Sequence, residues 1–182
     1  MQIQLLFVHV IFLFTILLTL CCCKNDDDNP TDPIDQLPPA TQTGEQTFGC
    51  LINGEAFLPD TFGSGRPNAF YQFVNGAYTF VISSSSGGGN SFIGIGVGGI
   101  DIQPLEESTY NLIEEQSGST FGKVIKNVDS YSTSVSNQGF LNITNFDPEN
   151  FIISGTFEFT VLDDDNNEIK ITDGRFDLKY TN

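Results

Sequence analysis

The stretch from Phe151 to Leu162 reads FIISGTFEFTVL, and it decides the fold class. Its large apolar residues alternate with polar ones, namely Phe157, Phe159 and Val161 against Thr156, Glu158 and Thr160. Successive side chains of a β-strand point to opposite faces of the sheet, so this period of two predicts a strand with one apolar face. After an Asp- and Asn-rich turn the alternation resumes and continues to Tyr180, which predicts an antiparallel partner strand.

The same period of two extends from Thr47 to Tyr180, without any run of apolar residues at i, i+3 and i+4 that is long enough for a good helix. Further strands are predicted at 69–74, 77–84, 91–102, 109–113, 130–135 and 140–146. Short strands separated by regular turns are typical of all-β domains. We therefore expect residues 47–182 to form a single antiparallel β-sandwich or barrel of about 8–10 strands.

Two Asn-Gly pairs predict hairpins, because both residues tolerate the positive φ of a type I′ turn. The first, Asn53-Gly54, places Cys50 opposite Phe57, so that this cysteine is expected to be a small buried apolar residue. The second, Asn75-Gly76, gathers four aromatic residues on one face: Tyr71, Phe73, Tyr78 and Phe80. Such a group is either core or a ligand platform.

Composition excludes several classes of function. The chain has 182 residues, a net charge of −16, one His and four Cys. His9 lies in an apolar N-terminal stretch, and Cys21, Cys22 and Cys23 follow that stretch directly. A processed chain would keep no His, which excludes Ser-His-Asp and Cys-His catalysis and His-ligated metals. The acidity argues against nucleic acid as a partner, because binding needs Lys and Arg at the phosphates.

The N-terminus predicts export and lipidation. The stretch from Leu5 to Leu20 has sixteen uncharged residues, near the length of a signal-peptide core and short for a transmembrane helix. Leu20-Cys21-Cys22-Cys23 resembles a bacterial lipobox, with residues 1–22 as signal peptide and Cys23 as the lipidated residue. Lipidation at Cys21 is the alternative register. An uncleaved anchor is a further alternative, and in each case the chain is attached to a membrane.

Residues 23–46 are predicted to carry the lipid and to form a flexible tether rich in Asp, Pro and Thr. The acidic run after Cys23 resembles the surface-export signal of Bacteroidota lipoproteins. It implies an outer-membrane protein, anchored by acyl chains such as palmitate, whose domain faces the cell exterior; the periplasmic face is the alternative. A solvated charge run at the head of a linker would look the same.

Four motifs recur together in one group of proteins. They are TFGCLING at 47–54, GFLNIT at 139–144, ISGTFEF at 153–159 and ITDGRFDLKY at 171–180. In these motifs the chain resembles an uncharacterised family of small lipoproteins from flavobacteria-like Bacteroidota. The resemblance implies a lipoprotein with a β-rich domain of unknown function, and it assigns no catalytic residue.

Candidate ligand sites are few. Asp163, Asp165 and Asn167 echo the alternate oxygen ligands of a calcium loop, although Asp and Asn are also ordinary turn residues. The run Gly94-x-Gly96-x-x-Gly99 matches a dinucleotide fingerprint but has no helix after it, so its glycines are expected to admit aromatic side chains from a neighbouring strand. No other cofactor is expected.

The sequence therefore favours a monomeric, lipid-anchored binding or interaction module, with an unidentified protein or glycan partner and no catalytic residues. The first alternative is a carrier of a lipid or sugar with a lipocalin-like cup. The second is a glycosidase-type hydrolase that would need two carboxylates facing each other across a cleft. Arg175 is expected to pair with a neighbouring carboxylate such as Asp173 or Asp177, and binding of an anionic ligand is the alternative.

Overall fold

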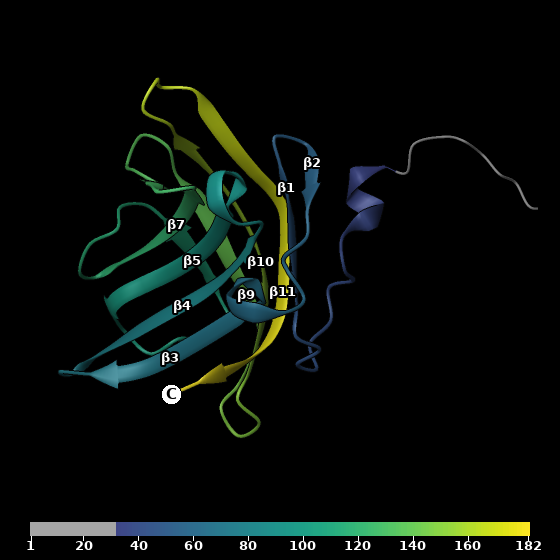
Figure 1. The fold of residues 1–182 in the computed structure, drawn as a ribbon. Helices are drawn as coiled ribbons and strands as arrows, with labels where there is room; N and C mark the ends of the chain where they lie inside the picture. Colours follow the sequence, from purple (N-terminus) through teal and green to yellow (C-terminus); the bar gives the residue numbers. More distant parts are fainter. Residues whose placement is uncertain (1–31) are drawn as a thin grey trace, which may run out of the picture. The chain divides into compact units, whose positions relative to one another are not determined.

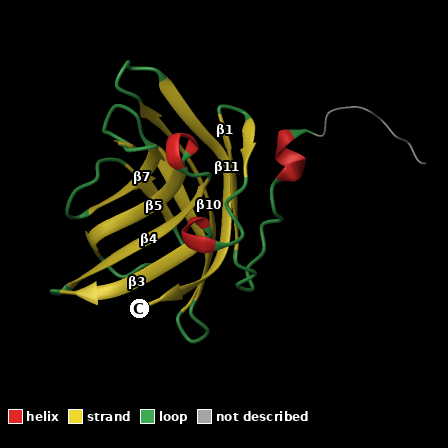
Figure 2. Cartoon of the chain, in the orientation of Figure 1, coloured by secondary structure: helices red, strands yellow, loops and turns green. Residues whose placement is uncertain are grey.

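The computed structural model describes residues 32–182, which form eleven strands and three short 3₁₀ turns, with no α-helix in that range (Figures 1 and 2). The strands are β1 (Thr47–Ile52), β2 (Glu55–Phe57), β3 (Asn68–Val74), β4 (Ala77–Ser86), β5 (Ile93–Ile102), β6 (Thr109–Leu112), β7 (Ser119–Lys126), β8 (Asp129–Ser132), β9 (Gly139–Asp147), β10 (Ile152–Leu162) and β11 (Glu168–Thr181). The 3₁₀ turns are η2 (Pro33–Gln36), η3 (Gly63–Gly65) and η4 (Gly89–Ser91). Over this range there is no helix with the length and hydropathy needed to cross a membrane.

The strands form one sheet that closes on itself. Its hydrogen-bonded order is β10-β9-β6-β7-β5-β4-β3-β11, and β11 pairs with β10 to complete the ring. β1 and β2 extend from β11, and β8 is attached to β7. The all-β, mostly antiparallel prediction is confirmed, and of the two architectures expected the structure is the closed one.

The last strand completes this ring. β11 pairs antiparallel with β10 and with β1, while its final residues pair parallel with the start of β3, Tyr180 with Ala69 and Thr181 with Phe70. Figure 1 shows β11 running the length of one wall, with the C-terminus beside β3. The two ends of the folded domain, β1 and β11, are therefore direct neighbours.

Both predicted Asn-Gly hairpins are present. Asn53 and Gly54 have φ of 52° and 88°, and Cys50 pairs with Phe57 as expected. Asn75 and Gly76, with φ of 54° and 95°, connect β3 to β4. Positive φ at both central residues is what a type I′ turn requires, so these two residue pairs fix the registers of their hairpins.

Side chains fill the interior of the ring. The core is built mainly from Phe, Ile, Leu and Val of β1, β4, β5, β7, β9, β10 and β11. Three inward glycines lie against phenylalanine rings of other strands, and these pairs are Gly99 with Phe80, Gly122 with Phe159, and Gly174 with Phe157. Glycine in a strand marks a position where another group comes close, and here that group is an aromatic ring in each case.

Part of the segment that the sequence predicts as a tether contacts the folded domain. Leu37 is buried, and residues 41–45, which we call the strap, bind the carboxylate of Asp177 on β11. The composition of this segment does not reveal the attachment, because the accepting carboxylate of Asp177 lies more than 130 residues further along the sequence. Within the described part of the predicted tether, Leu37 and the strap are thus attached to the rest of the domain.

Candidate functional site

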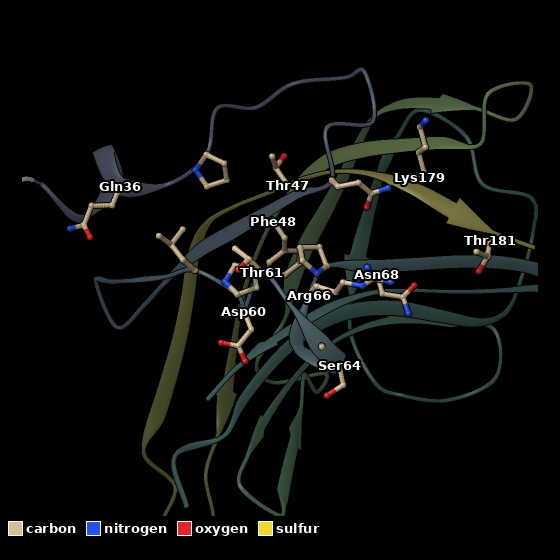
Figure 3. A pocket seen from close by; sticks show the side chains of 16 residues that line it. Gln36, Thr47, Phe48, Asp60, Thr61, Ser64, Arg66, Asn68, Lys179 and Thr181 are labelled. Atoms are coloured by element: carbon tan, nitrogen blue, oxygen red, sulfur yellow. The ribbon is translucent and has the colours of Figure 1, made fainter. Parts of the chain in front are cut away.

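The larger of two hollows, the first hollow, lies between the η2–β1 segment and the loop that joins β2 to β3 (Figure 3). Its volume is about 1110 Å³. Most of its polar side chains are uncharged, and they belong to Gln36, Gln46, Thr47, Thr61, Ser64, Asn68 and Thr181. Hydroxyl and amide groups both donate and accept hydrogen bonds, so this wall suits a ligand with many polar groups.

The loop that shapes this hollow, residues 58–67, is held to β4. The N–H of Asp60 donates to the carbonyl of Ser85 at 3.0 Å, and the hydroxyl of Ser84 donates to the carbonyl of Gly65 at 2.8 Å. A Cβ on Gly65 would lie 2.7 Å from the carbonyl oxygen of Ser85, so the close approach needs glycine here. These contacts hold the backbone at Gly65 in place, and Arg66 follows Gly65 directly.

Arg66 is the cation at the centre of the hollow. Figure 3 shows it in the middle of the labelled residues, with Gln36 and Thr181 at opposite ends. Its side chain is exposed and makes no ion pair with any carboxylate of residues 32–182. Lys179 stands at the rim, and Asp60 is the one carboxylate in the lining. In a chain with a net charge of −16, an unpaired arginine in a hollow favours an anionic ligand.

The second hollow lies on the outer face of β4, β5 and β7 and has a volume of about 330 Å³. Gly94 and Gly96 of β5 lie in its lining. Apolar residues in its lining include Val81, Phe92, Phe121 and Ile125. The rim carries Lys123, which forms an ion pair with Glu115 and lies 5.5 Å from the centroid of the Phe121 ring.

The two hollows adjoin each other. Ser64, Arg66 and Asn68 line both of them. The polar first hollow and the more apolar second hollow are therefore separated by one arginine and its two polar neighbours. Sequence reasoning did not single out Arg66 or Phe92. The available signal was a basic residue inside the Gly- and Pro-rich loop GSGRP in an otherwise acidic chain.

The predicted aromatic platform is placed on one face as expected, since Tyr71 pairs with Phe80 and Phe73 with Tyr78. Phe80 is fully buried in the core. Tyr71 stacks on Tyr78 with centroids 4.9 Å apart, whereas Phe73 is 63% exposed. None of the four lines either hollow. Three of them thus pack within the domain, and Phe73 extends to the surface.

The loop of the calcium candidate is a hydrogen-bonded turn. One carboxylate oxygen of Asp163 accepts from the N–H groups of Asp165 and Asn167, at 3.0 and 2.8 Å. The other accepts from the side-chain amide of Asn167 at 3.2 Å. These bonds from Asn167 and Asp165 lower the pKa of Asp163. The described residues contain no group of three or more His, Cys, Asp or Glu side chains placed to hold a metal ion.

Two other expectations have definite outcomes, and a third cannot be compared with the structure. Cys50 is a free, buried thiol whose pKa burial raises to about 12, as expected of an apolar core residue. The predicted pairing of Arg175 with a carboxylate is wrong, because its guanidinium donates to the backbone carbonyls of Asp173 and Pro38. The lipidation candidates Cys21 and Cys23 lie outside the described residues.

A scan against protein-family models, a search of curated proteins and a search of solved structures each found no match. The resemblance to Bacteroidota lipoproteins therefore stays a prediction. The function is inferred from the geometry of the two hollows and from the N-terminal sequence.

Proposed function

We propose that this chain is a lipid-anchored binding protein of the cell surface, attached through acyl chains on Cys23 in the outer membrane. The N-terminal sequence supports the anchor, since an apolar stretch of signal-peptide length ends directly at Leu20-Cys21-Cys22-Cys23. Several acyl chains give a durable attachment, because each buried methylene contributes about 0.8 kcal/mol. The acidic run that follows supports display on the exterior.

One observation carries the binding function, which is the unpaired Arg66 in the first hollow. A guanidinium recognises carboxylate, sulfate or phosphate groups through paired N–H donors. The surrounding Ser, Thr, Asn and Gln side chains supply uncharged donors and acceptors for the rest of the ligand. The ligand class is therefore a small anion or the anionic group of a larger molecule.

The two alternatives have less support. A carrier needs an open cup, whereas the interior of the ring is occupied by core side chains and both hollows involve residues outside it. A glycosidase needs two facing carboxylates, whereas each hollow has a single one, Asp60 in the first and Glu115 in the second. Glu115 is moreover bound to Lys123 and to Ser132.

The anchor is tested by metabolic labelling of cells that produce the full chain with a palmitate analogue. We expect label in the wild type and in a Cys21→Ala variant, and none in Cys23→Ala. Label that persists in Cys23→Ala but disappears in Cys21→Ala would assign the lipid to Cys21. Digestion by protease added to intact cells tests display, and full protection of the domain would contradict an exterior location.

The binding site is tested by NMR titration of the full-length protein in detergent micelles with sodium glucuronate. We expect shifts at the amides of residues 64–68 in the wild type and their loss in Arg66→Gln. Lys170→Gln is the matched control, because Lys170 carries the same charge, pairs with Glu168 and lines neither hollow. Equal shifts in Arg66→Gln and the wild type, or none in either, would contradict an anion site at Arg66.

A further inference from the structure

We propose that the two hollows form one elongated site for an acidic oligosaccharide, in which Arg66 binds a carboxylate or sulfate group while neighbouring sugar units occupy the hollows on either side. This inference rests on the proposed function and specifies its ligand. It depends on three features of the surface: the continuity of the hollows, their unlike linings, and the absence of a free strand edge where they meet β4, β5 and β7.

Continuity follows from the residues that the hollows share. Ser64, Arg66 and Asn68 line both. A ligand bound by Arg66 therefore has room to extend in two directions. With volumes of about 1110 and 330 Å³, the hollows together exceed the usual ligand pocket of about 300–1,000 Å³, which fits a chain of several units better than a single small molecule.

The first hollow matches the hydroxyl groups of sugars. Seven uncharged polar side chains line it, and they come from η2, the residue after the strap, β1, the loop before β3, the start of β3 and the end of β11. Their hydroxyl and amide groups can each serve as donor or acceptor. A sugar presents hydroxyls that are likewise donors and acceptors, so these uncharged side chains can form many weak hydrogen bonds with it.

The second hollow matches the flat faces of sugar rings. Phe92 is partly exposed and lies beside Gly94, with two ring carbons 3.5 Å from the position that a Cβ of Gly94 would occupy. Because neither Gly94 nor Gly96 has a side chain, the surface between Phe92 and Phe121 is left open for a close approach. An aromatic face beside such a surface can cover the C–H groups of a ring, while Ser83 and Ser85 remain for its hydroxyls.

An acidic peptide fits the same surface less well. Extended peptides usually add to a sheet by pairing with an unpaired strand edge. The strands under the second hollow have partners on both sides, since β4 lies between β3 and β5, β5 between β4 and β7, and β7 between β5 and β8. A peptide would find most backbone groups of these strands already paired, whereas a glycan needs only their side chains.

The test measures the affinity of the full-length protein in micelles by calorimetry. The probes are hexamers of galacturonate, hyaluronan and chondroitin sulfate, the carboxyl-reduced galacturonate hexamer, hexaglutamate and free glucuronate. We expect at least one acidic hexamer to bind about tenfold more tightly than glucuronate, because units on both sides of Arg66 add contacts. Hexaglutamate and the reduced hexamer are expected to bind at least tenfold more weakly than that acidic hexamer.

Two pairs of variants locate the ligand. Arg66→Gln should lower the affinity for the acidic hexamer about tenfold or more, and Lys170→Gln should not change it. Phe92→Ala should weaken hexamer binding several-fold. Phe73→Ala is its control, because Phe73 is an exposed phenylalanine that lines neither hollow. A Phe73→Ala variant that loses as much affinity as Phe92→Ala would place the ligand on the aromatic platform and overturn the proposal.

The remaining outcomes separate this inference from the proposed function. If glucuronate binds at Arg66 but no acidic hexamer binds more tightly, the oligosaccharide inference is wrong and the anion site stands. If hexaglutamate binds as tightly as the acidic hexamers, the site recognises charge on a chain and the ligand class is a peptide. If neither glucuronate nor any hexamer binds, both proposals fail.

Discussion

Asp177 is a fully buried carboxylate that is stabilised by hydrogen bonds from uncharged donors. Its five donors are the hydroxyls of Thr41 and Ser154 and the backbone N–H groups of Thr43, Gly44 and Glu45, at 2.7–3.1 Å. Burial alone raises the pKa of this carboxyl, and the hydrogen bonds, from Ser154 and Thr41 first, outweigh burial and lower it from 3.8 to about 2. The residue therefore attaches the strap to β10 and β11 in its charged form.

We expect Asp177→Asn to lower the free energy of unfolding by about 3 kcal/mol, because an amide offers fewer acceptors and turns its own donors toward other donors. The measurement is urea denaturation followed by circular dichroism. Asp165→Asn is the control, since Asp165 is exposed and makes no contact with the strap. A loss below about 0.5 kcal/mol would show that the strap does not depend on this carboxylate.

The lowered pKa also predicts a pH dependence. A carboxyl with a folded pKa of about 2 and an unfolded pKa near 3.8 stabilises the fold above the unfolded value, and this stability is lost as pH falls through the folded value. Unfolding free energies measured between about pH 5 and pH 2 should thus fall more steeply for the wild type than for Asp177→Asn. Parallel curves for the two proteins would contradict the assigned role.

At the scale of strands, close packing of glycine against phenylalanine shapes the interior. A Cβ on Gly122 of β7 would lie 2.6 Å from Cγ of Phe159, on β10 across the ring. A Cβ on Gly94, on the outer face of β5, would make ordinary contacts at 3.5 Å. The same substitution is therefore expected to have opposite consequences on the two faces of the sheet.

We expect Gly122→Ala to destabilise the domain by about 1–3 kcal/mol, since the ring of Phe159 must move in a filled core. Gly94→Ala should leave the unfolding free energy within about 0.5 kcal/mol of the wild type or raise it slightly, because alanine restricts the unfolded chain more than glycine. Thermal melts of both variants measure the difference. Equal midpoints would mean that the core relaxes around an added methyl group.

The parts of the sheet that can be predicted from the sequence are those encoded by residues close together in the chain. Both Asn-Gly turns, the pairing of Cys50 with Phe57 and the single face of the four aromatics follow from residues close together in the chain. β7 was missed, because Ser119–Lys126 mixes Gly122 and two lysines with its apolar residues. Its strand state depends on β5 and β8, which pair with it on either side.

The candidate site was not foreseen, for a related reason. Its first hollow lies where the loop at 58–67, the segment before β1 and the end of β11 meet, and no local pattern encodes that meeting. Arg66 stands out because no carboxylate of the described residues forms an ion pair with it, and this can be seen only in the folded structure. Likewise, Asp177 could not be matched to its donors, because these belong to a segment whose composition is that of a linker.

On the scale of the whole molecule, Tyr180 closes the ring. It pairs with Ala69 of β3, donates its N–H to the carbonyl of Phe151 at 2.8 Å, and contacts three aromatic rings, those of Tyr71, Phe146 and Phe151. Two residue pairs make up the whole contact between β11 and β3 in the sheet. This junction is therefore the shortest pairing in the closed ring apart from the parallel contact of β6 with β7.

We expect Tyr180→Ala to cost about 3–5 kcal/mol, as for other large aromatic residues removed from a core. Hydrogen exchange should accelerate first at β3 and at the end of β11, because the ring opens at their junction. Phe62→Ala is the control, since the Phe62 side chain is 87% exposed. Uniform acceleration across all strands would instead indicate that the sheet opens as one unit.

The position of β11 after the other strands of the described domain has a consequence for biosynthesis. β1, β3 and β10 all pair with this strand, which leaves the ribosome after them. Pairing between the first and last strands is long-range and slow to nucleate. A domain that emerges N-terminus first thus cannot close until β11 has emerged, and this delay would keep it in the unfolded state that a narrow export channel requires. If the N-terminus is lipidated as proposed, the acyl group would be attached before the domain it holds has closed.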